Sequence, residues 1–120
     1  MTNIKNFEDL KVWQKSIALA DDIYDATLGF PKEEMFGIVS QMRRSAFSVS
    51  YNLSEGSSRF SPKDQAYFYQ LSYSSLNELL CQVIICSDLG LIESDTLTDI
   101  RQKISEISLL INNLRKSRLK

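Results

Sequence analysis

The sequence has no histidine, only two prolines, four glycines and two cysteines, and no apolar run long enough to span a bilayer. The absence of histidine removes the commonest general acid–base group and the usual nitrogen ligand of zinc and di-iron sites. The glycines are scattered, so no glycine-rich phosphate loop occurs. The N-terminal segment lacks the basic and apolar regions of a signal peptide. We therefore expect a cytoplasmic protein with no catalytic residues, metal, cofactor or membrane partner.

The two cysteines, Cys81 and Cys86, lie five positions apart on one predicted helix. They point in different directions there, so they are poor disulfide partners, which agrees with a reducing compartment. No adjacent base accompanies them. We interpret both as small buried hydrophobic residues, with a catalytic thiol as the less favoured alternative.

Charge is nearly balanced, with 14 basic and 15 acidic residues and a net charge of −1. A dedicated nucleic-acid-binding protein usually has a strong basic excess. The distribution is uneven, however, because no acidic residue follows Glu106. The C-terminal tail after Glu106 is therefore basic. It either contacts phosphates or, as we favour, complements the negative end of a helix macrodipole. Its basic residues are Arg115, Lys116, Arg118 and Lys120.

Apolar residues recur at spacings of three and four in four segments, and no segment alternates as a strand would. The expected helices cover residues 8–28, 32–56, 62–89 and 95–117. Their short connections require consecutive helices to run antiparallel, and the spacing favours crossing angles near 20°. The sequence therefore predicts an all-α fold, a single domain over residues 1–120 built as an antiparallel up-down-up-down four-helix bundle.

Each expected helix has a stripe of residues that should face the core. The stripes are Leu10, Trp13, Ile17, Ala20, Tyr24 and Thr27 in the first helix; Met35, Val39, Met42, Ala46, Val49 and Leu53 in the second; Phe68, Leu71, Leu76, Leu79, Leu80, Val83 and Cys86 in the third; and Leu97, Ile100, Ile104, Ile107, Ile111 and Leu114 in the fourth.

Several residues are suited to the helix ends. Asn6 is expected to cap the first helix, and Ser61 the third, with Pro62 in its first turn. Gly56 and Gly90 suit the left-handed conformation that ends a helix.

A polar stripe follows one face of the second helix, and a partner stripe follows the third. With the connecting turn centred near residues 58–60, Glu78 falls within one turn of Arg44. We therefore predict an Arg44–Glu78 ion pair, with Arg43 as the alternate donor. A polar seam at a helix–helix or subunit interface is favoured over a simply solvated face. The stripes are Gln41, Arg44, Ser48, Asn52 and Glu55, and Ser72, Ser75, Glu78 and Gln82.

Six aromatic residues lie off the core stripes and cannot all face one bundle core. Some must be exposed or covered by another copy of the chain. Aromatic residues are enriched at protein interfaces, although platforms for stacking unpaired bases use the same residue types. The near-neutral charge favours the interface. The six are Phe36, Phe47, Tyr51, Tyr67, Tyr69 and Tyr73.

Three stretches carry a family resemblance: FEDLKVWQKS (residues 7–16), FPKEEMFGIVSQMRRSAFSVSYNLSEG (30–56) and LNELLCQVIICSDLGLI (76–92). Together they resemble the four-helix-bundle proteins of the 23S rRNA intervening-sequence protein family, also called the S23 ribosomal protein family. The resemblance implies a bacterial, intracellular protein that forms a ring-shaped homopentamer. The accessory variability protein of diversity-generating retroelements, which binds reverse transcriptase and nucleic acid, looks like a relative.

The resemblance also carries over individual residues. Ser54, Ser74 and Leu80 depart from the family's usual alanine, glycine and acidic residue, and the missing glycine is expected to loosen close helix packing. The residues that match the family's motifs are Gln41, Arg43, Arg44, Asn52, Glu55, Gly56 and Glu78.

Two functional hypotheses follow, with an enzyme as the least favoured third. The first is a non-enzymatic, RNA-associated homo-oligomer. The second is a protein–protein interaction scaffold related to the retroelement accessory protein, which binds a protein partner and no nucleic acid. Salt-dependent RNA binding separates them. In the first hypothesis, the oligomer arranges its basic residues in rings that contact RNA. These residues are Arg43, Arg44, Arg59, Lys63, Arg115, Lys116, Arg118 and Lys120.

Overall fold

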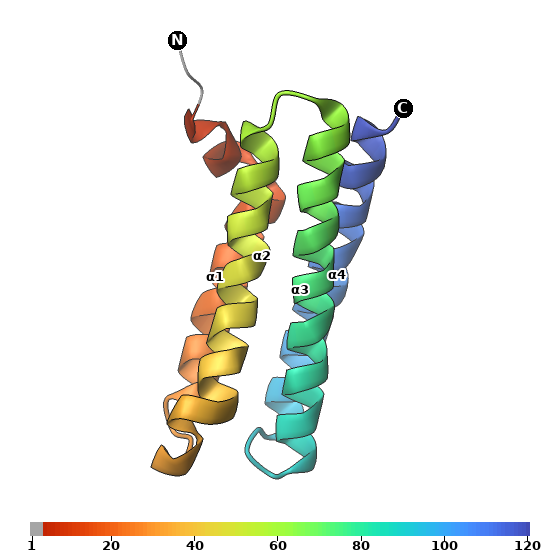
Figure 1. Cartoon of the computed structure of the whole chain (residues 1–120). Coiled ribbons are helices and arrows are strands. Elements are labelled where there is room, and N and C mark those ends of the chain that lie inside the picture. The colour runs from red at the N-terminus through yellow and green to blue at the C-terminus, as the bar shows by residue number, and fades with distance from the viewer. Residues whose placement is uncertain (1–3) are drawn as a thin grey trace.

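A computed structural model describes the backbone of residues 4–120 and the side chains from Phe7 onward. Its four α-helices are α1 (Lys11–Thr27), α2 (Ser40–Ser58), α3 (Pro62–Asp88) and α4 (Ser94–Arg118), and residues 4–120 contain no strand. Each helix contacts two neighbours, and consecutive helices run antiparallel (Figure 1). The bundle measures 46 × 24 × 19 Å. The predicted all-α, antiparallel four-helix bundle is confirmed.

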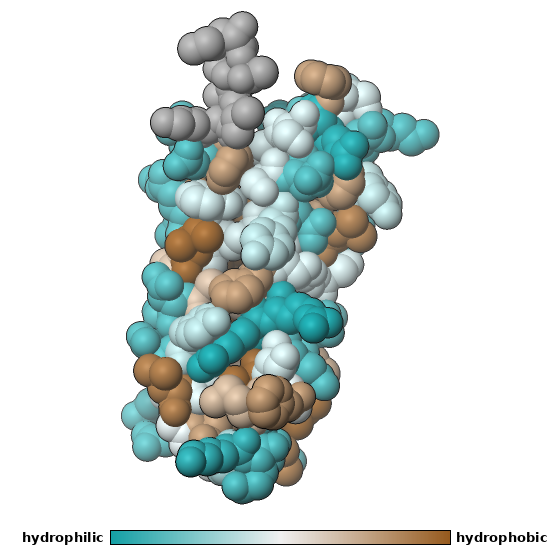
Figure 2. Space-filling model, turned by 60° about the vertical axis from the view of Figure 1, so that its left-hand side comes forward, coloured by the Kyte–Doolittle hydropathy of each residue, from teal (hydrophilic) through white to brown (hydrophobic). Residues whose placement is uncertain are grey.

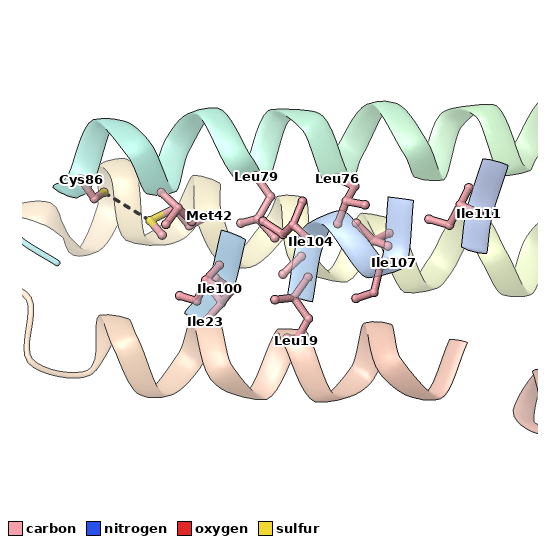
Figure 3. Packing of buried hydrophobic residues seen from close by; sticks show 14 of the residues in the cluster. Leu19, Ile23, Met42, Leu76, Leu79, Cys86, Ile100, Ile104, Ile107 and Ile111 are labelled. Carbon is pink, nitrogen blue, oxygen red and sulfur yellow. Dashed lines mark hydrogen bonds between the residues drawn. The ribbon is translucent and has the colours of Figure 1, made fainter. Parts of the chain in front are cut away.

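The core is a column of aliphatic side chains contributed by all four helices. Figure 3 shows Leu19 of α1, Leu79 of α3 and Ile104 of α4 pointing toward one another across the bundle axis. Full burial of one such side chain stabilises a fold by about 1.5–3 kcal/mol. The predicted stripe of α4 is confirmed at its four isoleucines, Ile100, Ile104, Ile107 and Ile111, which are all buried.

Both predicted ends of α3 are confirmed. The Ser61 side chain accepts a hydrogen bond from the Asp64 backbone N–H at 3.0 Å, as an N-cap should. At the other end Gly90 adopts φ 79°, and the Leu91 N–H donates to the Cys86 carbonyl at 2.9 Å. This is the hydrogen bond of a Schellman motif, which requires a left-handed residue.

The expected first helix, over residues 8–28, is divided. A 3₁₀ helix, η1 (Ile4–Asp9), precedes α1, and the extended residue Leu10 (φ −71°, ψ 122°) separates the two. The N-cap of α1 is therefore Leu10. The side chain of Asn6, the expected cap, lies outside the described residues.

The predicted core face of α1 is partly wrong. Ile17 and Tyr24 are 37% and 39% exposed, while hydroxyl residues take places in the interior. Ser16 is buried because its Oγ pairs with Ser50 Oγ at 2.9 Å, which satisfies both hydroxyls. The observed buried residues of α1 are Val12, Ser16, Leu19, Ala20, Ile23 and Thr27.

The expected helix over residues 32–56 is also divided. It begins as a 3₁₀ turn, η2 (Lys32–Glu34), followed by a π-helical segment, η3 (Met35–Val39). Helical geometry is interrupted inside η3 at Gly37 (φ −108°, ψ −110°), and the regular helix starts only at Ser40. Met35, expected in the core, is 39% exposed beyond this break.

Gly56 was expected to end the second helix, but it lies within α2. A Cβ atom at this position would stand 2.7 Å from Cε1 of Tyr69 and 3.2 Å from the Gln65 carbonyl oxygen. Glycine is therefore needed here for close approach of α2 and α3. Tyr69, expected off the core, is only 1% exposed and belongs to it.

Lys103 of α4 links two helices by ion pairs. Its Nζ lies 2.7 Å from Asp22 Oδ2 in α1 and 3.0 Å from Asp99 Oδ2 one turn earlier in α4. Hydrogen bonds to Asp22 and then Asp99 raise the pKa of Lys103 above its usual value. The Lys103 side chain is 43% exposed, so solvent weakens the interaction.

Replacing Lys103 with methionine is expected to lower the free energy of unfolding by less than about 1 kcal/mol at neutral pH. Because the folded-state pKa is raised, the lysine's contribution is complete below the unfolded-state value near 10.4 and is lost as the pH rises through the folded-state value. Urea unfolding at pH 7 and above pH 11 measures the difference between wild type and variant. Lys32→Met, at an exposed position, is the control. A difference that does not shrink at high pH contradicts the assignment.

Candidate nucleic-acid interface

A polar seam between α2 and α3 lies within one chain. Ser48 Oγ pairs with Ser75 Oγ at 2.8 Å, and Asn52 Nδ2 donates to the Ser48 carbonyl at 2.9 Å. Nearer the axis, Ser72 Oγ donates to the Val49 carbonyl at 2.7 Å. Small hydroxyl residues satisfied in this way let the two helices approach closely. Ser48 and Asn52 of the predicted stripe thus take part in helix packing.

The predicted Arg44–Glu78 ion pair is wrong. Both side chains are exposed, and the ion pairs among the described residues do not include them. The pairing of Ser48 with Ser75 centres the α2–α3 connection on residues 61–62, midway between them. This centre differs from the expected 58–60, but it places position 79 opposite position 44 and so brings Glu78 nearly level with Arg44. The pair does not form because both side chains lie on exposed helix faces, and hydroxyl and amide groups occupy the seam instead.

Two further residues of the predicted α2 stripe, Gln41 and Glu55, leave the seam. Gln41 is exposed, and Glu55 pairs with Arg59 at 3.0 Å, one turn later. The Arg59 guanidinium in turn lies 4.4 Å from the centroid of the Phe68 ring. Glu55 and Arg59 therefore form a surface pair near the α2–α3 connection.

The two cysteines differ in environment, which corrects the expectation that both are buried. Cys81 is exposed and Cys86 is buried, with its Sγ 3.5 Å from Met42 Sδ. Burial, and to a lesser degree the charge of Glu34, raises the pKa of the Cys86 thiol. A raised pKa keeps this thiol protonated and unreactive. Residues 7–120 contain no cluster of three acidic or cysteine side chains that could hold a metal ion.

Arg43 faces α1 and is held in a fixed orientation there. Its Nε donates to Thr27 Oγ1 at 3.1 Å, and its guanidinium carbon lies 3.9 Å from the centroid of the Tyr24 ring. The Thr27 hydroxyl donates onward to the Ile23 carbonyl at 2.8 Å. Arg43 therefore joins α2 to α1 while its charge stays close to the surface.

Around Arg43 lies an open groove of about 590 Å³, which we call the aromatic groove. The Tyr24 and Phe47 rings are stacked with their centroids 5.7 Å apart, and the Tyr51 ring lies next to Phe47 with a centroid separation of 6.3 Å. Figure 2 shows this face, where strongly hydrophilic side chains cross between hydrophobic patches. No carboxylate lines the groove, whose residues are Tyr24, Met35, Phe36, Val39, Ser40, Arg43, Arg44, Phe47, Ser48 and Tyr51.

The other predicted phosphate contacts gather elsewhere. The α2–α3 connection and the C-terminus lie at the same end of the bundle (Figure 1). Among the described residues at this end, within 7–14, 53–68 and 112–120, seven basic residues face four acidic ones. We call this the basic end; its cations are Lys11, Arg59, Lys63, Arg115, Lys116, Arg118 and Lys120.

The opposite end of the bundle is strongly acidic. It contains the α1–α2 and α3–α4 connections (Figure 1). Residues 21–34 and 85–99 carry nine acidic residues and a single lysine, Lys32. The small net charge of the chain therefore hides a separation of charge along its length. Sequence reasoning missed this, although an up-down topology already places the second connection beside the C-terminus.

Fold and surface together define a four-helix bundle with oppositely charged ends and an aromatic groove. Residues 8–113 match the family model described as 23S rRNA-intervening sequence protein, and the chain belongs to this family. No helix within the described residues is long and apolar enough to cross a membrane.

The fold is similar to that of a solved structure from the same family. This is a protein of unknown function from the S23 ribosomal protein family of Bacteroides thetaiotaomicron, with a TM-score of 0.78 and 21% identity. The match covers 88% of this chain and 98% of that chain. No curated protein matches the sequence significantly.

Proposed function

We propose that the protein is a non-catalytic, oligomeric RNA-associated protein of the bacterial cytoplasm, and that it contacts RNA phosphates through the basic end. The observation that carries this proposal is the separation of charge, which places seven cations at one end of a chain whose net charge is −1. Membership of a family named for an rRNA intervening sequence points to the same kind of partner.

The acidic end does not cancel this attraction at physiological salt. The Debye length is then about 8 Å, whereas the bundle is 46 Å long. A phosphate at the basic end is therefore screened from the acids at the other end. Each lysine or arginine that meets a phosphate also releases condensed counterions, which favours binding.

Assembly of several copies would strengthen a patch of this size. The resemblance to the family implies a homopentamer, and linked copies can raise affinity about 10²–10⁴-fold without a new contact. Large apolar side chains are available for self-association outside the aromatic groove. Tyr67, Ile85 and Leu89 of the α3 region are 59%, 46% and 65% exposed, and Leu109 of α4 is 61% exposed.

The basic end is tested by neutralising two of its exposed lysines together, Lys63→Gln and Lys116→Gln. We expect affinity for a structured RNA hairpin to fall at least tenfold at 0.1 M salt, and the slope of log affinity against log salt to fall by about two. The matched control is Lys32→Gln with Arg101→Gln, which removes two charges from exposed positions away from the basic end. Absence of hairpin binding by the wild type at low salt overturns the proposal.

The exposed apolar side chains also favour a second candidate, a protein-interaction scaffold without nucleic-acid binding. Light scattering coupled to gel filtration gives the solution mass. An oligomer that binds no RNA at low salt supports this second candidate. A monomeric mass contradicts the oligomeric state that both candidates assume.

A further inference from the structure

We propose that the aromatic groove binds an unpaired stretch of RNA, with bases stacked on Phe36 and Tyr51 and a phosphate held by Arg44. This inference rests on the proposed function and adds to it the form of RNA that is recognised. The aromatic groove lies on the side of the bundle, whereas the basic end lies at its tip.

The groove offers rings with free faces. Phe36 is 97% exposed and Tyr51 is 69% exposed, while Phe47 behind them is only partly buried and stacks on Tyr24. An aromatic ring on which a base stacks strengthens single-strand binding about 5- to 150-fold, and it does so with every base because each has a π-face. The stacked pair of Tyr24 and Phe47 supplies a rigid floor for the two exposed rings.

The charge of the groove suits an anionic ligand. Arg43 and Arg44 both line it, and no carboxylate does. Arg43 is already oriented by Thr27 and the Tyr24 ring, so it supplies a fixed positive potential. Arg44 is exposed and stands outside the ion pairs of the described residues, so its guanidinium is available to a phosphate.

Unpaired RNA fits these features better than a duplex does. In an A-form helix the base faces are stacked inside, and a protein meets only the phosphates, 2′-hydroxyls and base edges. Phe36 and Tyr51 would then have no base to stack on. Arg44 and Arg59 are separated by about 22 Å along α2 at 1.5 Å per residue, so one strand can leave the groove along α2 and reach the basic end.

The test compares a 12-nucleotide oligoadenylate with a 16-base-pair RNA duplex by fluorescence anisotropy at low salt. The groove variants are Phe36→Ala with Tyr51→Ala, and separately Arg44→Gln; all three positions are exposed, so the bundle should keep its thermal stability. We expect each variant to weaken oligoadenylate binding about tenfold or more and to leave duplex binding unchanged. Tyr73→Ala, an exposed tyrosine outside the groove, should change neither.

The possible failures are distinguishable. If groove variants bind oligoadenylate like the wild type while Lys63→Gln with Lys116→Gln weakens binding, this inference is wrong and the proposed function stands. If the wild type binds neither RNA, both are wrong. If the groove variants lower the solution mass of the protein, the groove is covered by a second copy, and the inference is overturned.

Discussion

Replacing Tyr69 with alanine is expected to lower the free energy of unfolding by about 3–5 kcal/mol. The ring is 1% exposed and lies in the core, and its hydroxyl is within hydrogen-bond distance of Ser57 Oγ at 3.1 Å. The substitution leaves a cavity between α2 and α3 and removes this hydrogen bond. Urea unfolding followed by circular dichroism measures the loss.

The neighbouring Tyr67 provides a matched control. It has the same side chain on the same helix but is 59% exposed, with its ring against Phe68 at 5.2 Å. Tyr67→Ala should therefore lower stability by less than about 1 kcal/mol. Equal losses at the two positions would mean that Tyr69 is not a core residue.

Gly56→Ala is expected to lower the free energy of unfolding by about 1–3 kcal/mol, because the added methyl group overlaps a rigid buried ring. The added Cβ would stand 2.7 Å and 2.9 Å from two carbons of Tyr69. The sign of the stability change is informative, because at an exposed helix position alanine stabilises the helix by up to about 1 kcal/mol relative to glycine. Gly29→Ala is the control: nothing lies within 4 Å of its Cβ position and its φ is not positive, so a small stabilisation is expected.

The two substitutions should be strongly non-additive. In the Tyr69→Ala background the space beside residue 56 is open, so Gly56→Ala should cost nothing or stabilise the helix slightly. A double-mutant cycle by urea unfolding measures this coupling. Additive losses would show that the glycine is required for another reason, such as contact with the Gln65 carbonyl oxygen, 3.2 Å from the Cβ position.

The bundle was predictable because the four isoleucines of α4 and the short connections allow one simple arrangement. The buried face of α1 was not, because hydrophobic periodicity counts only apolar side chains. Ser16, outside the predicted stripe, enters the interior because its hydroxyl pairs with Ser50 Oγ. Thr27, which belongs to the stripe, is buried as predicted, and its hydroxyl donates to the Ile23 carbonyl. The buried face of α1 therefore includes Ser16, Leu19 and Ile23, and Tyr24 lies at the surface.

The candidate site was predicted by residue type more than by position. The basic residues and exposed aromatics were identified, but sequence gave no means of pairing Arg43 with Thr27 and Tyr24 across α1 and α2. The Arg44–Glu78 error does not come from the register, because the Ser48–Ser75 pair sets Glu78 nearly opposite Arg44. Residue spacing could not show that both side chains lie on exposed faces of their helices. Tyr69 was misplaced because its burial depends on the absent side chain of Gly56.

The separation of charge along the bundle has a consequence for how the molecule meets its partners. A rod with opposite charges at its ends has a large electric dipole moment, and the field of a polyanion exerts a torque on it within a Debye length or so of contact. Encounters would then begin with the C-terminus of α4 leading, before any specific contact forms. Added salt would remove this alignment, so productive collisions would become rarer even where the final complex is held by stacking.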